Sequence, residues 1–324
     1  MKSANLNALV VLRTRIQQLG GLRLTREYFR IGVLWPMFKA VIRNPFNRQS
    51  YKKAYSVALS KVEPILAGKY GALMPERKAY YTSQQLGHHK SKIIWFCWLQ
   101  GLENAPDIVK VCYASLLRHF PDREIRVIDD SNWAEYVSLP EYVIDRWKKK
   151  QIPPANFSDL LRLELLIRYG GTWIDATVLC TGKENTEKYL NADLFMFQYT
   201  RPGSDEWGGI GNWFISSCTN NEVLMVLRDM LYAYWKDYDC TLDYYIFHLF
   251  FSMLREVYPE EIAAMPYGYA TRHIALAKHW GGKFDQEKWD KLVSKVSFHK
   301  LTHVISKRTK ADSENYYNWI LKNC

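Results

Sequence analysis

The sequence of 324 residues lacks any apolar run near the roughly 20 residues that a membrane-spanning helix needs. Its nearest candidate, residues 31–42, is short and is interrupted by Pro36 and Lys39. Cysteine is sparse too: the six residues are scattered, none forms a Cys-x-x-Cys pair, and no signal peptide is recognisable at the start. We therefore expect the reducing cytoplasm as the compartment.

Two common nucleotide-binding motifs are also missing. The sequence contains neither Gly-x-Gly-x-x-Gly nor a P-loop, so dinucleotide-dependent dehydrogenases and P-loop NTPases lose support. No internal repeat or low-complexity tract occurs. A hydrophobic content of 48%, with 15% aromatic residues, instead indicates a globular chain that can bury one large core or two modest ones.

The net charge of +11 has one location. Residues 1–61 contain twelve Lys or Arg and a single acid, Glu27, so this segment accounts for the whole excess. We interpret residues 1–65 as a basic amphipathic helical extension that lies on an anionic membrane surface, where each basic residue contributes about 1 kcal/mol. A helical subdomain with a solvated basic face explains the pattern equally well. Nucleic-acid binding is not expected, because no known motif accompanies the charge.

The remaining residues divide into a short connection and a domain. Residues 66–91 are polar and contain glycine, which predicts a linker or mobile loop. The domain, residues 92–324, opens with a predicted strand (92–98), helix (106–120), strand (124–128) and helix (140–150). A helix and a strand then follow within residues 156–180, and further strands are predicted at 194–199 and 210–216. Alternating strands and helices indicate a Rossmann-like α/β fold.

Residues 156–180 hold the most informative pattern. Asn156 or Ser158 can cap a helix that Gly170-Gly171 ends, because glycine tolerates the left-handed conformation at a helix C-terminus. On this helix Asp159 and Arg162 lie three residues apart and share one face. Taken alone, the two side chains are explained by an intrahelical ion pair.

The strand after the two glycines contains one charge. Alternation places Trp173, Asp175 and Thr177 on the same face. A carboxylate among apolar residues is costly unless it meets a cation or a hydrogen-bond donor, so Asp175 is a candidate functional residue. It lies at the carboxyl end of a strand, where open α/β sheets bind ligands.

The pattern as a whole resembles a known signature. It reads Ser158-Asp159-x-x-Arg162, then Gly170-Gly171-x-Trp173-Ile174-Asp175-Ala176-Thr177. It is similar to the S-D-x-x-R…G-G-x-Y-x-D-x-D signature of sugar-nucleotide transferases, which include family-32 glycosyltransferases and, more distantly, glucosylating bacterial toxins. Together with the run Lys92 to Trp98, it looks most like the capsular polysaccharide synthesis proteins, over residues 90–305.

The resemblance implies a GT-A fold and transfer of a hexose from a UDP-sugar, usually with retention of anomeric configuration. By position, Trp95 would stack on the uracil base and Asp159 would accept hydrogen bonds from ribose or sugar hydroxyls. Arg162 would hold the sugar or the diphosphate through charge-assisted hydrogen bonds. Ser158 and Gly171 belong to the same donor-binding pattern.

The resemblance also implies a divalent metal, Mn²⁺ or Mg²⁺, with one departure from the family pattern. Asp175 matches the first acid of the D-x-D motif, but Thr177 stands at the second acid. These ions prefer hard oxygen ligands, and a threonine hydroxyl is a weaker, neutral one. The expected metal ligands are therefore Asp175, Thr177, the diphosphate and His299, while Lys300 could instead neutralise the diphosphate. Asp243 is the candidate on the sugar side.

Two hypotheses follow for the whole protein. The first is a hexosyltransferase, with glucose or galactose as the sugar, that extends a lipid-linked oligosaccharide for capsular or cell-surface polysaccharide. It would work in the cytoplasm, bound peripherally at the inner face of the cell membrane. The second is a catalytically inert, transferase-like scaffold that lost its metal site at Thr177 and binds a membrane or partner proteins.

Overall fold

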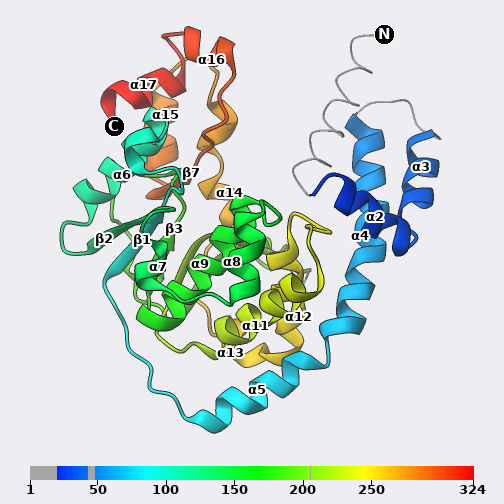
Figure 1. Cartoon of the computed structure of the whole chain (residues 1–324). Helices are drawn as coiled ribbons and strands as arrows, with labels where there is room; N and C mark the ends of the chain where they lie inside the picture. Colours follow the sequence, from blue (N-terminus) through cyan, green and yellow to red (C-terminus); the bar gives the residue numbers. More distant parts are fainter. Residues whose placement is uncertain (1–19, 43–47, 205) are drawn as a thin grey trace. The chain divides into compact units, whose positions relative to one another are not determined.

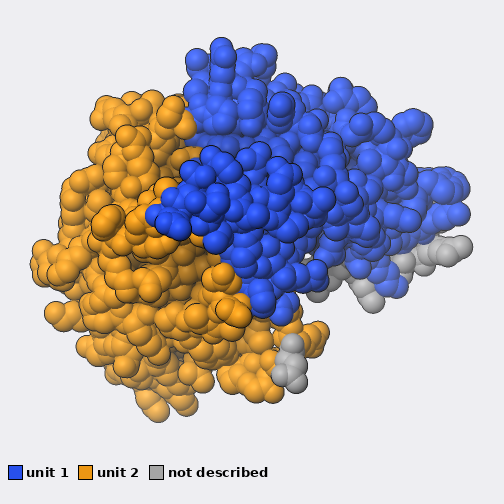
Figure 2. Space-filling view, turned by 90° about the horizontal axis from the view of Figure 1, so that it is seen from below, with its two compact units in different colours: residues 1–85, 139–160, 225–259 blue, residues 86–138, 161–224, 260–324 orange. Residues whose placement is uncertain are grey.

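The computed structural model describes residues 20–42, 48–204 and 206–324 (Figure 1). The chain forms two compact units, which Figure 2 shows in different colours. The first unit comprises residues 1–85, 139–160 and 225–259, and the second comprises residues 86–138, 161–224 and 260–324. Each unit therefore combines segments that are far apart in the sequence.

The described elements of the first unit are helices: α2 (Leu22–Arg30), α3 (Leu34–Ile42), α4 (Arg48–Tyr70), α5 (Leu73–Gln84), α8 (Glu141–Lys148) and α12 (Ile246–Val257). Within the predicted N-terminal extension, residues 1–65, the structure has helices α2 and α3 and most of α4. Residues 1–19 and 43–47, which the same prediction covers, lie outside the described part of the chain. Two further helices, α9 (Pro154–Tyr169) and α11 (Glu222–Asp237), each run from one unit into the other.

The segment expected as a linker is mostly helical. The end of α4 and the whole of α5 occupy it, residues 71–72 form the turn between them, and residues 85–91 lack regular secondary structure. The polar residues of α5 lie on its exposed side, whereas Met74 and Tyr81 are buried. High polarity therefore marks one face of an amphipathic helix here, not a loop.

The second unit holds the strands: β1 (Ile93–Cys97), β2 (Glu124–Ile128), β3 (Gly171–Ile174), β4 (Val178–Cys180), β5 (Leu194–Gln198), β6 (Ile210–Ser217) and β7 (Phe298–Lys300). Its helices are α6 (Asp107–His119), α7 (Trp133–Tyr136), α10 (Glu187–Leu190), α14 (Ala270–His273), α15 (Gln286–Val293), α16 (Lys307–Ala311) and α17 (Tyr316–Asn323). It also holds α13 (Pro259–Ala263) except for its first residue, which belongs to the first unit. Short 3₁₀ helices cover Leu102–Asn104 and Leu276–His279.

Five of the strands form one sheet in the order β2-β1-β3-β6-β5. β1 runs parallel to β2 and β3, whereas β6 is antiparallel to β3 and β5. β4 and β7 form a separate antiparallel pair, which joins the segment after β3 to the C-terminal region. The α/β, Rossmann-like fold predicted from the sequence is confirmed.

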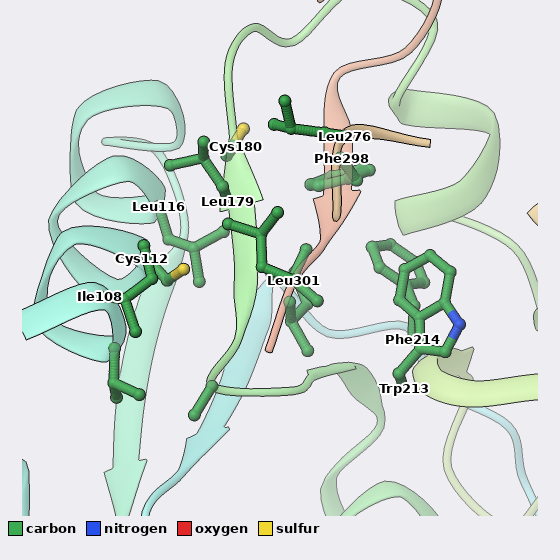
Figure 3. Packing of buried hydrophobic residues seen from close by; sticks show 14 of the residues in the cluster. Ile108, Cys112, Leu116, Leu179, Cys180, Trp213, Phe214, Leu276, Phe298 and Leu301 are labelled. Carbon is green, nitrogen blue, oxygen red and sulfur yellow. The ribbon is translucent and has the colours of Figure 1, made fainter. Parts of the chain in front are cut away.

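A buried apolar cluster joins the sheet to α6 and to the β4–β7 pair. In Figure 3, Ile108, Cys112 and Leu116 of α6 point toward Leu179 and Cys180 of β4. These α6 positions are three or four residues apart, so they lie on one face of the helix. The packing fixes the β4–β7 pair and with it the segment that follows β3.

Gly170 and Gly171 form the sharp connection between α9 and β3. Both have positive φ values, 65° and 93°, which side chains other than glycine rarely adopt. A Cβ atom on Gly171 would lie 2.3 Å from the carbonyl oxygen of Ile93 in β1. The glycine therefore allows β3 to pair closely with β1. It lies at the amino end of β3, three residues before the strand's carboxyl end.

None of the helices within the described residues is long and apolar enough to span a membrane.

Candidate active site

The carboxyl ends of β2, β1 and β3 meet at one edge of the sheet. Cys97, the last residue of β1, pairs with the last residue of β2, and β1 is also in parallel register with β3. The residues that directly follow these three strands are Asp129, Trp98 and Asp175. Polar and aromatic groups therefore collect at the edge where α/β sheets bind ligands.

Asp175 is fixed in both its backbone and its side chain. Its backbone N–H donates to the carbonyl of Trp213 at 2.9 Å, which continues the β3–β6 pairing. Its Oδ1 accepts a hydrogen bond from Trp173 Nε1 at 2.9 Å and lies 3.5 Å from Arg162 Nη2. Its Oδ2 accepts a hydrogen bond from Lys300 Nζ at 2.8 Å. The carboxylate thus has the partners that its position in the sequence required.

Lys300 reaches the site from a distant part of the sequence. In the β4–β7 pair it is opposite Val178, and the backbone N–H of Leu301 donates to the carbonyl of Thr177 at 2.8 Å. Its ammonium contacts two side chains, Asp175 Oδ2 at 2.8 Å and Thr177 Oγ1 at 2.6 Å. The backbone pairing of β7 with β4 therefore holds Lys300 beside the segment that contains Asp175 and Thr177.

Arg162 is held almost completely out of solvent. Its Nη1 donates to the carbonyl of Asn212 at 2.8 Å, and its guanidinium carbon lies 4.8 Å from the centre of the Trp173 ring. Only 5% of the side chain is exposed. A planar guanidinium suits this combination of stacking and directed hydrogen bonds, which a lysine would not reproduce.

Two cations determine the charge state of Asp175. Burial alone would raise the pKa of Asp175, but attraction to Lys300 and Arg162 outweighs it and holds the pKa below its usual range. Burial raises the pKa of the neighbouring Cys97 thiol to about 12, so this group stays neutral. Lys300 and Arg162 thus both lie against the Asp175 carboxylate, and fixed cations of this kind are suited to binding an anionic ligand.

His299 lies next to Lys300 on β7 but makes different contacts. Successive side chains of a strand point to opposite faces, and the ring Nε2 of His299 lies 3.0 Å from Thr181 Oγ1. Burial, with a contribution from nearby His273, lowers the pKa of His299 to about 3. The imidazole is therefore neutral, and it is buried against Thr181, away from Asp175.

The expected metal ligands do not converge in this structure. Both oxygens of Asp175 and the hydroxyl of Thr177 are engaged by protein donors, and His299 contacts Thr181. Across residues 20–42, 48–204 and 206–324, no three His, Cys, Asp or Glu side chains are placed to hold a metal ion together. The residues present do not fit the divalent cation that the family resemblance implies.

Trp95, the expected base-stacking residue, lies in the core. It is fully buried, and its Nε1 donates to the carbonyl of Gly170 at 2.9 Å. Its ring packs against the rings of Tyr136 and Tyr169, with centroids 5.8 and 5.5 Å away. The ring has no exposed face for a base, so the stacking role remains a prediction that this structure does not support.

Trp98 is the aromatic residue at the ligand-binding edge. It follows the last residue of β1, is half-buried, and packs edge-on against the ring of His303 at 5.2 Å. Its Nε1 is buried without a hydrogen-bond partner among the described residues. The sequence alone does not distinguish it from Trp95, because both tryptophans lie in the same apolar run. Placing the strand's end at Cys97 would have identified Trp98 as the first residue beyond it.

Ser158 and Asp159 lie in the part of α9 that belongs to the first unit. Ser158 donates a hydrogen bond to the carbonyl of Ala155, and buried Asp159 lies 3.5 Å from Asn156 Nδ2. Arg162, one turn later on α9, belongs to the second unit. The structure thus brings together Arg162, Asp175, Thr177 and Lys300, and the roles of Ser158 and Asp159 remain predictions.

Asp243 also lies in the first unit. It is buried, accepts a hydrogen bond from the backbone N–H of Tyr245 at 2.6 Å, and has its pKa raised by burial. Two residues earlier, Thr241 donates to Asn156 Oδ1 at 3.3 Å, so the segment before α12 is linked to the start of α9. The proposed catalytic role of Asp243 remains a prediction.

The family model of capsular polysaccharide synthesis proteins matches residues 42–320. No curated protein shows significant similarity to the chain. Among solved structures, the chain is similar to one titled PaToxG Glycosyltransferase, at 14% sequence identity and a TM-score of 0.38. That match covers 62% of this chain and 83% of the other. A likeness at this level carries no conclusion about activity.

Proposed function

The chain belongs to the family of capsular polysaccharide synthesis proteins, and we propose that it is a glycosyltransferase that moves a hexose from a UDP-sugar to a lipid-linked oligosaccharide. The sugar is glucose or galactose, and transfer retains the anomeric configuration. The observation that carries the proposal is the group formed by Arg162, Asp175 and Lys300 at the carboxyl edge of the parallel strands. It supports a GT-A-type donor site.

The charges of this group suit a nucleoside diphosphate. Arg162 and Lys300 supply positive charge at fixed positions, and preorganised charges of this kind stabilise negative charge that develops in a transition state. The carboxylate of Asp175 is ionised and can accept hydrogen bonds from ribose or sugar hydroxyls. We assign base stacking to Trp98, because its ring lies at the edge and that of Trp95 does not.

The proposed reaction breaks the bond between the anomeric carbon and the β-phosphate oxygen. A bond from the same carbon to an acceptor hydroxyl oxygen forms, and the proton of that hydroxyl passes to the departing UDP. Negative charge therefore grows on the diphosphate while the sugar carbon becomes positive. The two cations of the site act on the diphosphate side of this change.

Release of UDP from a panel of UDP-hexoses, in the presence of a lipid-linked acceptor fraction, tests the proposal. We expect one donor to be used and Asp175→Asn to reduce the rate at least about 100-fold, as loss of one preorganised electrostatic group does in other enzymes. Asp290→Asn, which changes an exposed carboxylate on α15, is the matched control and should keep the wild-type rate. Release of UDP from no donor would contradict the proposal.

An anionic lipid surface is the proposed partner of α2 and α3. Four large apolar side chains there are more than half exposed: Leu22 (89%), Phe29 (77%), Trp35 (61%) and Phe38 (53%). Exposed basic residues accompany them: Arg26, Arg30 and Lys39. Aromatic and basic residues together suit the interface of an anionic membrane, which is where a lipid-linked acceptor resides. The protein would then work peripherally at the inner face of the cell membrane.

Liposome sedimentation tests this part of the proposal. The pair of substitutions Trp35→Ser and Phe38→Ser should weaken binding to anionic liposomes at least about tenfold, since each large apolar side chain gains about 1.5–3 kcal/mol on full burial. Leu117→Ser, which removes an exposed apolar side chain from α6, is the control and should leave binding unchanged. Equal sedimentation of all three proteins would refute membrane docking by α3.

A second candidate function is an inert, transferase-like scaffold. The observation that favours it is the neutral Thr177, which stands where the family pattern has an acid. A thermal-shift measurement separates the two functions. UDP at a hundred times its Kd stabilises a protein that binds it by about 2.7 kcal/mol. A shift that Asp175→Asn abolishes supports the enzyme, and the absence of any shift supports the scaffold.

A further inference from the structure

We propose that the ammonium of Lys300 occupies the position that a divalent metal takes in a D-x-D site, so that sugar transfer by this protein needs no divalent metal. The inference rests on the proposed glycosyltransferase function and concerns the same site. It follows from the contacts that Lys300 makes with the two side chains of the altered motif, Asp175 and Thr177.

The position of the ammonium is the first argument. A metal in a D-x-D site is held by side-chain oxygens of the motif at about 2.0–2.6 Å. In this protein Lys300 Nζ lies 2.8 Å from Asp175 Oδ2 and 2.6 Å from Thr177 Oγ1. It therefore lies between the same two side chains and satisfies both. A metal ion placed between the same two side chains would lie close to the ammonium and would be repelled by it.

The charge of the motif is the second argument. Two carboxylates would balance a divalent ion, whereas Asp175 and Thr177 together carry one negative charge. The single positive charge of Lys300 balances that charge directly. The threonine, which is a poor ligand for Mn²⁺ or Mg²⁺, is a good hydrogen-bond acceptor for an ammonium. Both the threonine at position 177 and its contact with Lys300 are therefore consistent with an ammonium, and not a divalent ion, at this place.

The backbone provides the third argument, because Lys300 is built into the site. It pairs with Val178 in the β4–β7 ladder, and the next residue, Leu301, bonds to the carbonyl of Thr177. Phe298, Leu301 and Leu179 pack in the apolar cluster that supports this ladder. The lysine is therefore positioned by the core, and its ammonium does not depend on a mobile surface loop.

The ammonium also retains capacity for a ligand. A lysine has three N–H donors, and within the described residues two of them are directed at Asp175 and Thr177. The side chain is 24% exposed. The third donor can therefore bind a diphosphate oxygen, and the positive charge stabilises the departing UDP as the anomeric C–O bond breaks. Lys300 thus supplies the charge that a metal would supply.

His299 does not restore a metal site in this arrangement. It is 1% exposed, and its Nε2 contacts Thr181. As the neighbour of Lys300 on a strand, its side chain points to the opposite face. A metal held between Asp175 and His299 would therefore need the imidazole to leave its buried contact with Thr181.

The test compares wild-type protein in excess EDTA with wild-type protein in Mn²⁺ or Mg²⁺, using UDP release and, separately, UDP binding by calorimetry. We expect rates and affinities to agree within about twofold. Lys300→Met should reduce the rate at least about 100-fold, whereas Lys291→Met, an exposed lysine on α15, should leave it unchanged. Thermal unfolding of Lys300→Met confirms that the variant is folded.

Loss of wild-type UDP binding in EDTA, with recovery in Mn²⁺, would overturn the proposal, and so would wild-type activity of a folded Lys300→Met variant. Activity of Lys300→Met that appears only with added Mn²⁺ would support it, because the metal would then replace the missing ammonium. Failure of the proposed function gives a different result: UDP binds equally in EDTA and Mn²⁺, but no UDP-hexose is turned over under either condition.

Discussion

Replacement of Gly171 by alanine tests whether this glycine is needed for the fold or for binding the UDP-sugar donor. Its φ of 93° is strained for alanine, which costs about 1–3 kcal/mol. The new Cβ would also lie 2.3 Å from the carbonyl oxygen of Ile93, so β1 and β3 must move apart. Overpacking of this kind costs a further 1–3 kcal/mol or so, which is similar to the cost of the backbone strain.

Gly209→Ala is the matched control, because Gly209 has a similar φ of 86° and nothing lies within 4 Å of its Cβ position. Gly209→Ala should therefore show only the destabilisation that comes from the strained φ. At about 2–4 °C per kcal/mol, Gly171→Ala should lower Tm by at least about 2 °C more than Gly209→Ala. UDP affinity of the folded Gly171→Ala protein should stay within about twofold of the wild type. Equal Tm losses, or a selective loss of UDP affinity, would refute the structural role.

Two further predictions concern Trp98 and His299. Trp98→Ala should weaken UDP binding about 5- to 150-fold with little change in Tm, since stacking on a base contributes about 1–3 kcal/mol. Trp95→Ala should chiefly lower stability, by about 3–5 kcal/mol. The reverse pattern in titration and unfolding would restore the role first expected for Trp95. The folded-state pKa of His299 is about 3, below its ordinary value of 6.5, so the unfolded state binds more protons between these values. The free energy of unfolding should therefore fall as pH is lowered from 6.5, by up to about 1.4 kcal/mol per pH unit. In denaturant titrations, the free energy of unfolding of His299→Asn should depend less on pH than that of the wild type. The same pH dependence in both proteins would contradict a buried, neutral imidazole.

The local order of strands and helices could be read from the sequence. The apolar run before Trp98, the helix over residues 106–120 and the glycine pair before Asp175 each carry a local signal, and the structure has elements at these places. Asp175 could also be singled out, because a charge within an apolar strand needs a partner. These features depend on residues that are close in the sequence.

What could not be predicted depends on contacts between distant residues. Lys300 is 125 residues from Asp175, and only the pairing of β7 with β4 brings them together. The same limit applies to Trp95 and Trp98, because which of two tryptophans leaves the core depends on where β1 ends. The polar segment 66–91 is a third case. Its helix α5 is stabilised by the burial of Met74 and Tyr81 against other elements.

Transfer of labelled hexose from the UDP-sugar into the lipid-extractable fraction, measured together with UDP release, tests the proposed donor site most directly. Wild-type protein should release one UDP for each sugar transferred, in EDTA as well as in Mn²⁺. A folded Asp175→Asn variant should do neither at more than about one hundredth of the wild-type rate. Equal UDP release and transfer by wild type and Asp175→Asn would contradict a donor site formed by Arg162, Asp175 and Lys300.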